Sequence, residues 1–400
     1  MYNFKTIGEI DLTGKRVLVR ADLNVPMKDG RVADMTRINR LMPTLRDLIA
    51  NRARVIIMSH FGRPEGKYLP EMTLRPVAKV LSQALGYDVS FAGDCIGEVA
   101  VKAVARLQPG NILLLENLRY HAGEENNDPE FVKKLAALSD VYVNDGFSVA
   151  HRSHASTVGI AHILPAFAGR QMQAELEALG AVLDNPMPKV VAIIGGSKIS
   201  TKLELLDNLV QKVDILMIGG GMANTFLNAQ GVNVGKSLCE KNLAEIARGI
   251  LEKANLVKCE IILPIDALVS TELEKEVRAS VCDIKAVPAN SMILDIGPAT
   301  VRLLESKLAK CKTLIWNGPL GAFEIKPFDS GTNALSEVVA NLTSAGDLVS
   351  VAGGGDTVSA LNNAGVFDKL TYVSTAGGAF LEWLEGKELP GVKVLMGQTN

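Results

Sequence analysis

The chain has 400 residues, enough for two domains that each bury a full hydrophobic core. Its 42 basic and 44 acidic residues nearly cancel, which argues against a general nucleic-acid-binding or membrane-surface protein but allows a local basic cluster. The five cysteines are scattered and form no CxxC pair, a usage typical of a reducing cytoplasm without a metal knuckle. No signal-peptide core or membrane-length apolar run is found, so we expect a cytoplasmic protein with no membrane or nucleic-acid partner.

Short apolar runs rich in Val and Ile alternate with helical patterns along the chain. They lie at 16–20, 54–59, 88–91, 111–116 and 140–144 before residue 170, and at 189–194, 214–219, 260–265, 291–296, 313–317, 347–352 and 371–375 after residue 185. Runs that are apolar on both alternations are typical of parallel sheets covered by helices on both faces. The pattern therefore predicts an α/β protein with two doubly wound, Rossmann-like parallel sheets.

The boundary between the two sheets is expected within 169–190. The middle of this segment is a polar helical pattern without a wide apolar stripe, and the pattern closes at Asn185-Pro186. We predict an N-terminal domain over 1–170, a C-terminal domain over 171–380 that includes the linking helix, and a helical hinge between them.

The residues that follow the predicted strands differ between the two halves. In the first half the strand ends read RADLN, SHFGRP, ENLRYH, NDGF and AHRSH, and in the second half they read GGSK, GGGM, PID, DIGP, WNGP, GGGDT and STAGG. Open α/β sheets bind ligands beyond the carboxyl ends of their strands. The first half is thus predicted to grip a compact anion with side chains, and the second to bring its backbone close to phosphates or to a large flat group.

Three basic residues stand at helix starts, where the helix dipole disfavours cations. Thr201 and Glu204 form a candidate capping box, which would place Lys198 and Lys202 just before and at the first turn. Arg37 lies in the first turn of another predicted helix. A bound anion would explain all three, whereas the alternative is two solvated lysines and an arginine whose stem covers the core. Four strand-end loops that each carry an arginine favour the anion.

The stretch VAGGGDT, residues 351–357, joins a predicted strand to a predicted helix. Asp356 or Thr357 is a candidate N-cap, and the glycines would let backbone N–H groups approach an anion. Asp356 could also hold Mg²⁺ beside phosphates. Glu324 could accept hydrogen bonds from a ribose or be an ordinary exposed glutamate, and the pattern does not choose between these.

Two nucleotide-binding motifs are excluded by their context. The stretch QGVNVGKS, residues 230–237, ends like a P-loop, but Gln230 stands where the motif needs glycine and the stretch follows a helical pattern. No GxGxxG fingerprint opens a helix after the first strand, which disfavours a nicotinamide dehydrogenase. A two-lobed solute-binding protein is the other alternative, and the two-lysine helix start and missing signal peptide disfavour it.

Along its whole length the chain resembles the phosphoglycerate kinase family. The motifs that carry the resemblance are RADLNVP, DMTRI, SHFGRP, LLLENLRYHAGEE, VNDGFSVAHRSHAST, GGSKISTKL, GGGMANTF, WNGPLGAFE, VAGGGDT and STAGGAFLEWLEGKELPG. Two residues depart from the family pattern: Thr201 stands where Asp is common, and Ala376 stands where glycine is usual.

The resemblance implies reversible phosphoryl transfer from 1,3-bisphosphoglycerate to MgADP, which gives 3-phosphoglycerate and MgATP in glycolysis. ATP or ADP would be the co-substrate, Mg²⁺ the cofactor and the protein a monomer. Because the attacking oxygen is already ionised near neutral pH, we expect no general base, and catalysis by positioning and charge stabilisation. We also expect hinge closure around 169–190 and a C-terminal tail, 381–400, that returns to the first domain.

The resemblance also assigns residues. Those expected at phosphoglycerate are Asp22, Leu23, Asn24, Arg37, His60, Phe61, Gly62, Arg63, Arg119 and Arg152. Those expected at the nucleotide are Lys202, Gly220, Gly221, Asn317, Glu324, Gly354, Gly355, Asp356 and Thr357, with Asp356 on Mg²⁺. Arg37 and Lys198 would stabilise the phosphoryl group in transfer.

Overall fold

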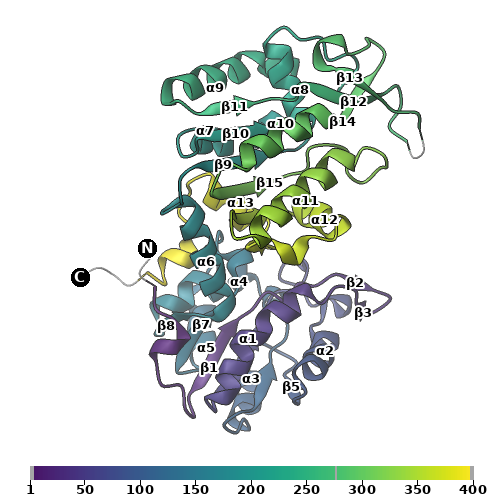
Figure 1. Ribbon diagram of the computed structural model, residues 1–400. Helices are drawn as coiled ribbons and strands as arrows, with labels where there is room; N and C mark the ends of the chain where they lie inside the picture. The colour runs from purple at the N-terminus through teal and green to yellow at the C-terminus, as the bar shows by residue number, and fades with distance from the viewer. Residues whose placement is uncertain (1–3, 275–276, 397–400) are drawn as a thin grey trace. The chain divides into compact units, whose positions relative to one another are not determined.

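The computed structural model describes residues 4–274 and 277–396, which fall into two compact units (Figure 1). The N-terminal unit comprises the described residues of Tyr2–Glu177 and Glu388–Asn400, and the C-terminal unit comprises those of Ala178–Lys387. The last described residues, yellow in Figure 1, return to the start of the chain, because Phe4 and Met396 form an antiparallel bridge within the N-terminal unit.

A six-stranded parallel sheet forms the centre of the N-terminal unit. Its strands are β1 (Arg16–Arg20), β4 (Arg54–Met58), β5 (Val89–Phe91), β6 (Ile112–Leu114), β7 (Val141–Asn144) and β8 (Ala166–Ala168), in the order β5-β6-β4-β1-β7-β8. Strands β4, β5 and β6 lie on one side of β1, and β7 and β8 lie on the other side, which makes the sheet doubly wound. All five strands predicted in this half are confirmed. The sequence did not predict β8 or the short hairpin of β2 (Met27–Lys28) and β3 (Arg31–Val32).

Helices cover both faces of this sheet. They are α1 (Thr36–Ala50), α2 (Arg75–Leu85), α3 (Gly97–Ala105), α4 (Ala122–Glu125), α5 (Pro129–Ala136) and α14 (Pro390–Lys393). Val17 and Val19 of β1 share one core with side chains of α1 and α2. Leu18, between them, shares a second core with side chains of α3 and α5. Because successive strand residues point to opposite faces, this alternation explains why the runs are apolar throughout.

The C-terminal unit repeats the arrangement. Its parallel strands are β9 (Val190–Ile194), β10 (Ile215–Ile218), β11 (Glu260–Ile262), β15 (Thr313–Asn317), β16 (Val349–Gly353) and β17 (Tyr372–Ser374), in the order β11-β10-β9-β15-β16-β17. Its helices are α7 (Leu203–Val210), α8 (Gly220–Ala229), α9 (Ala244–Val257), α10 (Pro298–Leu308), α11 (Ser330–Ser344), α12 (Gly355–Asn363) and α13 (Gly378–Leu384). Val191 and Trp316 of the sheet share a core with α10, α11 and α12. The prediction of two doubly wound parallel sheets is thus confirmed.

One predicted strand was assigned to the wrong sheet. The run at 291–296 forms β14 (Met292–Ile296), but β14 belongs to a separate antiparallel sheet of order β13-β12-β14. Its partners β12 (Asp266–Ser270) and β13 (Ser280–Asp283) were not predicted. An apolar run shows that a strand is buried without showing the direction of its neighbours, and β13 is too exposed to give an apolar run at all.

A single helix, α6 (Arg170–Leu183), runs from the N-terminal unit into the C-terminal unit, which divide at 177/178. Its start is anchored by the buried Asp145, whose Oδ1 accepts hydrogen bonds from the backbone N–H groups of Gln171 at 2.9 Å and Met172 at 3.1 Å. Across the described ranges, no helix combines the length and the apolar character that a membrane span requires.

Candidate functional site

Polar side chains gather at one edge of the N-terminal sheet. Asp22 and Asn24 follow β1, His60 follows β4, Arg119 follows β6 and Arg152 follows β7. Because the four strands are parallel, their carboxyl ends meet at the same edge. This is the edge at which open α/β sheets bind ligands.

The loop after β1 holds Arg37 in place. The Nη1 of Arg37 donates to Oδ1 of Asp22 at 3.2 Å and to the carbonyl oxygen of Asn24 at 2.5 Å. The other carboxylate oxygen of Asp22 accepts from the hydroxyl of Ser148 at 2.5 Å, and Oδ1 of Asn24 accepts from the N–H of Gly62 at 2.9 Å. Arg37 is the second residue of α1, as predicted, and its side chain keeps 32% of its surface exposed, so the guanidinium can still meet a ligand.

His60 lies among arginines. Burial holds its pKa well below the usual range, and the positive charges of Arg20, Arg119, Arg37 and Arg152 lower it further. A guanidinium can only donate, so the 3.2 Å contact between Nη2 of Arg20 and Nδ1 of His60 makes Nδ1 the acceptor. The ring is therefore neutral with its proton on Nε2, and it carries hydrogen-bonding capacity without adding charge to the cluster.

Arg20 is a member of this cluster that the sequence analysis missed. It is fully buried as the last residue of β1, and its Nε donates to the hydroxyl of Ser156 at 2.8 Å. Ser156 in turn donates from its backbone N and hydroxyl to the buried carboxylate of Glu124, at 3.0 and 2.6 Å. Burial raises the pKa of Glu124 while the charge of Arg20 opposes that rise. A charged residue at the end of the apolar run RVLVR was the only available signal.

Arg119 and Arg63 differ in exposure. Arg119 keeps only 3% of its surface and donates from Nη1 to the carbonyl oxygen of Gly62 at 2.8 Å, while its Nε lies 3.1 Å from Oε1 of Glu125. Burial is the main cause that lowers the pKa of Arg119. Arg63 is exposed, and Arg152 is half-buried with its Nε 3.3 Å from Nε2 of His151.

Two predicted binding residues belong to the core. Leu23 and Phe61 are buried in the hydrophobic cluster under α1 and α2. Their backbone N–H groups donate to the hydroxyl of Ser59 and to Oδ1 of Asn117, at 2.9 and 3.0 Å. These two residues therefore set the shape of the strand-end loops, and their side chains are buried in the core.

In the C-terminal unit, Lys202 joins two strand ends. Its Nζ donates to the carbonyl oxygen of Gly195 at 2.7 Å and to Oδ1 of Asn317 at 2.5 Å. Gly195 directly follows β9, and Asn317 is the last residue of β15. Burial lowers the pKa of Lys202 to about 8, and the charge of Asp356 acts in the opposite direction.

The predicted capping box at Thr201 and Glu204 is wrong. The helix α7 begins at Leu203 with Lys202 as its N-cap, and it is preceded by the short turn η7 (Ile199–Thr201). The hydroxyl of Thr201 donates back to the carbonyl oxygen of Lys198 at 2.9 Å, and Glu204 pairs with Lys387 at 2.5 Å. Lys202 still lies at the start of α7 as its N-cap, whereas Lys198 precedes the turn η7 and is exposed.

The predicted N-cap of α12 is also wrong. The residue at the N-cap position is Gly354, so neither Asp356 nor Thr357 caps the helix. Gly354 has a φ of 101°, a conformation that residues with a side chain rarely adopt. Thr357 instead joins two turns: its hydroxyl donates to the carbonyl oxygen of Gly353 at 2.8 Å and accepts from the N–H of Gly318 at 2.7 Å. Asp356 is exposed in the first turn of α12.

The glycines of this unit have a structural reason beyond ligand approach. A Cβ on Gly195 would lie 1.8 Å from the carbonyl oxygen of Pro319, and a Cβ on Gly220 would lie 2.6 Å from that of Gly196. The strand-end turns therefore touch one another backbone to backbone. Gly220 also has a φ of 66°, which opens α8 in a left-handed conformation.

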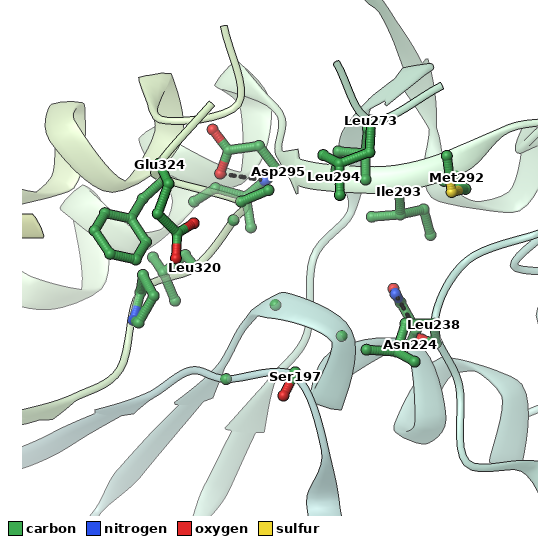
Figure 2. Close-up of a pocket in the computed structure, with 18 of the residues that line it drawn as sticks. Ser197, Asn224, Leu238, Leu273, Met292, Ile293, Leu294, Asp295, Leu320 and Glu324 are labelled. Atoms are coloured by element: carbon green, nitrogen blue, oxygen red, sulfur yellow. Dashed lines mark hydrogen bonds between the residues drawn. The ribbon is translucent and has the colours of Figure 1, made fainter. Parts of the chain in front are cut away.

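These turns form one wall of a pocket of about 380 Å³ (Figure 2). In the view of Figure 2, Ser197 lies on one side of the pocket and residues 292–295 of β14 lie opposite, with Glu324 at the left. Gly220, Gly221, Glu324 and Asp356 among the predicted nucleotide residues line it. Its apolar lining includes Leu238, Leu273, Met292, Ile293 and Phe323, and the part contributed by β14 was missed because that strand was assigned to the parallel sheet.

Two motif questions are settled by the backbone. The stretch 230–237 follows α8 and forms a loop, so the rejected P-loop lacks its strand, as predicted. Ala376 does not adopt a positive φ, so alanine fits this position without backbone strain.

Comparisons with known proteins agree along the whole chain. A family model described as "Phosphoglycerate kinase" matches residues 7–387. The chain is 59% identical over 393 residues to a phosphoglycerate kinase of Granulibacter bethesdensis, covering 98% of this chain and 99% of the relative. It is 58% identical over 393 residues to one of Rhizobium meliloti, covering 98% of each. Among solved structures it is similar to phosphoglycerate kinase from Coxiella burnetii, with 44% identity, a TM-score of 0.92 and 100% of both chains covered, and to that from Pyrococcus horikoshii, with 32% identity, a TM-score of 0.82 and 98% of both covered.

Proposed function

The chain belongs to the phosphoglycerate kinase family, whose members are ATP:3-phosphoglycerate 1-phosphotransferases, and from this premise we propose that it transfers a phosphoryl group reversibly between 1,3-bisphosphoglycerate and MgADP in glycolysis. The observation that carries the proposal is the chemical difference between the two strand edges. One edge gathers guanidinium groups around a neutral histidine, and the other gathers glycine turns and an amine beside an apolar pocket.

The arginine edge is proposed to bind phosphoglycerate. Arg37 and Arg63 offer exposed or half-exposed guanidinium groups, which suit bidentate contact with phosphate and carboxylate oxygens. The buried Arg119 and Arg20 act through their charge and through the loops they hold. Neutral His60 can donate from Nε2 to a substrate oxygen.

The glycine edge is proposed to bind the nucleotide. A pocket with apolar walls suits the flat base, and the starts of α8 and α12 present N–H groups that suit phosphate oxygens. Lys202 and Lys198 would add positive charge there, while Glu324 could accept a bond from ribose.

Magnesium fits the donor set at this edge. Asp356 is an exposed carboxylate that lines the pocket, and Mg²⁺ is commonly held by one or two carboxylates together with substrate phosphates. When bound, the ion would neutralise phosphate charge. The protein residue that would hold it is Asp356.

The catalytic step is proposed to need no general base, because the attacking carboxylate oxygen is already ionised. Arg37 and Lys198 would stabilise negative charge on the transferring phosphoryl group. His60 and His154 both have pKa values below the usual range, with that of His154 near 4, so neither ring is charged at neutral pH. We assign His60 an orienting role in place of proton transfer.

Hinge closure around 169–190 is proposed to bring the two substrates together, since an acyl phosphate must be shielded from water. The continuous helix α6 supports this, because it belongs in part to each unit.

All five cysteines are free thiols, which suits the proposed cytoplasmic location. We expect a monomer, because the residues proposed to bind each substrate all come from one unit of this chain.

The test is incubation of the pure chain with MgATP and 3-phosphoglycerate, with ADP as the readout. ADP should form only when both substrates are present. A change in nicotinamide absorbance with a 2-hydroxy acid would indicate a dehydrogenase, and tight 3-phosphoglycerate binding without turnover would indicate a binding protein.

A further inference from the structure

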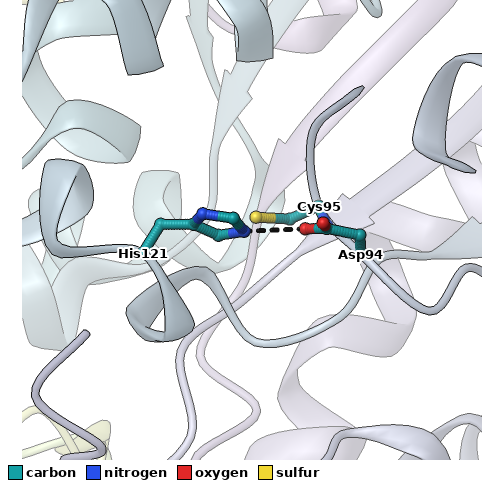
Figure 3. A group of neighbouring side chains, drawn as sticks. All are labelled: Asp94, Cys95 and His121. Carbon is teal, nitrogen blue, oxygen red and sulfur yellow. Dashed lines mark hydrogen bonds and ion pairs between the residues drawn. The ribbon is translucent and has the colours of Figure 1, made fainter. Parts of the chain in front are cut away.

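Three side chains that commonly bind metals meet in the N-terminal unit, outside the residue sets described above (Figure 3). Asp94 and Cys95 lie in the loop between β5 and α3, and His121 lies between η3 (Leu118–Tyr120) and α4. One donor atom from each lies within 4.8 Å of the others. The phosphoglycerate and nucleotide sites give these three residues no role.

The three donors are held by their own surroundings. Oδ1 of Asp94 accepts from the N–H of Cys95 at 2.6 Å, which fixes the carboxylate against its loop. Nε2 of His121 lies 2.7 Å from the same oxygen, and the imidazole packs on the ring of Phe131 with centroids 5.5 Å apart. The side chain of Cys95 is fully buried in the core cluster of α3 and α5. A ligand therefore meets a prearranged set of oxygen, sulfur and nitrogen.

The site is open on one side and negative on the other. The side chains of Asp94 and His121 are 39% and 31% exposed, so an ion has an entry path and room for water. Burial is the main cause that raises the pKa of the Cys95 thiol, and the negative charges of Asp94 and Glu124 act in the same direction, so a metal ion would have to displace the thiol proton. A thiolate and a carboxylate together would balance the charge of a divalent cation, with the imidazole neutral.

We propose that Asp94, Cys95 and His121 form a zinc-binding site whose fourth ligand is water. Zinc takes sulfur, imidazole nitrogen and carboxylate oxygen in a tetrahedron, whereas Mg²⁺ prefers oxygen ligands alone. With metal–ligand bonds of about 2.0–2.3 Å, the donors of such a site lie about 3.3–3.8 Å apart. The observed spacing brackets that range: Nε2 of His121 and Oδ1 of Asp94 lie 2.7 Å apart, and the three donors lie within 4.8 Å of one another.

Metal at this site would tie the loop of residues 94–95 to the segment 116–125. That segment carries Arg119, so zinc would stiffen the backbone under one of the arginines of the cluster. The expected effect is on the stability of the N-terminal unit, since none of the three ligands reaches the predicted substrate residues through a hydrogen bond that we observe. The proposal is independent of the phosphotransferase activity.

The test uses the full chain, stripped of metal with a chelator and then titrated with Zn²⁺ or Co²⁺ in the presence of excess Mg²⁺. We expect one equivalent to bind, a rise in melting temperature with Zn²⁺, and a near-ultraviolet thiolate-to-cobalt charge-transfer band with Co²⁺. His121→Gln and Asp94→Asn change partly exposed positions and should fold, and each should weaken zinc binding by about tenfold or more. Cys95→Ser should remove the charge-transfer band.

His162→Gln and Cys282→Ser are matched controls, because they remove a histidine and a cysteine from other parts of the chain; both should bind zinc as the parent does. Failure of the parent chain to take up one equivalent would overturn the proposal. So would a charge-transfer band that survives in Cys95→Ser, or zinc affinity unchanged in both His121→Gln and Asp94→Asn. In those cases the 2.7 Å contact between His121 and Asp94 is a hydrogen bond only.

Discussion

The Nζ of Lys202 lies 2.5 Å from Oδ1 of Asn317, and that contact joins the start of α7 to the end of β15. Asn317 extends the link, because its Nδ2 donates to the carbonyl oxygen of Gly353 at 2.8 Å. Lys202 therefore has a structural task in the unliganded protein as well as a proposed task at the nucleotide. The structural task should show in the free energy of unfolding, and the proposed task should show in the affinity for ATP.

We expect Lys202→Met to impair both tasks. It leaves the oxygen atoms of Gly195 and Asn317 without their donor, which should lower the free energy of unfolding by about 1–3 kcal/mol. It should also raise KM for ATP, because positive charge is lost beside the phosphates. Lys202→Arg keeps the charge and should retain more of the affinity. Urea unfolding and steady-state kinetics measure the two effects, and Lys212→Met, at an exposed position of the same unit, is the control. Unchanged KM in Lys202→Met would remove this residue from the nucleotide site.

Arg37→Ala should lower kcat by about 100- to 1000-fold, since a preorganised charge on the transferring group is lost. The partly exposed ion pair with Asp22 should contribute no more than about 1 kcal/mol to stability. Arg46→Ala, at an exposed position of the same helix, should leave both turnover and stability near those of the parent. Near-normal turnover of Arg37→Ala, measured with both substrates saturating, would show that Arg37 does not act on the transferring group.

Substitutions of the neighbouring Gly354 and Gly355 should separate the effect of backbone strain from the effect of ligand contact. Gly354→Ala places a Cβ 2.6 Å from Nδ2 of Asn317 at a φ of 101°, so it should destabilise the chain by about 2 kcal/mol or more. Gly355→Ala meets open space and should leave the unfolding midpoint unchanged. If phosphates approach the start of α12, Gly355→Ala should still weaken ATP binding in calorimetry. Unaltered ATP affinity in this stable variant would place the phosphates elsewhere.

Because the pKa of His154 is lowered in the folded chain, we expect the free energy of unfolding to depend on pH. Burial is the main cause that lowers its pKa from 6.5 to about 4 in the folded chain, with the charge of Arg119 adding to the shift. Between pH 6.5 and about pH 4, His154 is protonated in the unfolded chain but not in the folded chain. The free energy of unfolding that depends on neutral His154 is therefore lost as the pH falls from 6.5 towards 4.

The loss is isolated by comparing urea unfolding of the parent and of His154→Gln at several pH values across that window. The variant should lose less stability on acidification than the parent, and His162→Gln controls for removal of a histidine from the same unit. Parallel curves for the parent and His154→Gln would contradict the prediction.

The sequence was sufficient for the two parallel sheets because buried strands in such sheets are apolar on both faces, as Val17, Leu18 and Val19 illustrate. It was insufficient for β14, because burial alone does not report strand direction. The start of α7 was placed about two residues too early, and the candidate caps at Thr201 and at Asp356 or Thr357 were wrong. At Thr201 the hydroxyl bonds within its own turn to the carbonyl oxygen of Lys198, and at α12 the glycine Gly354 occupies the cap position.

For the candidate sites, motif positions located the loops but not the direction of each side chain. Leu23 and Phe61 lie in motifs yet point into the core, whereas Arg20 lies in a strand yet reaches the cluster. The wall of the pocket built from β14 could not be predicted without the antiparallel sheet. These features depend on packing between distant segments, which spacing along the chain does not encode.

The most direct test of phosphoryl transfer to 3-phosphoglycerate is to trap the product. Hydroxylamine converts an acyl phosphate into a hydroxamate, so the chain is incubated with MgATP, 3-phosphoglycerate and hydroxylamine, and ADP and hydroxamate are both measured. Equal amounts of the two, abolished when 3-phosphoglycerate is omitted, are the predicted result. ADP formed without hydroxamate would mean transfer to water, and it would contradict the proposed reaction.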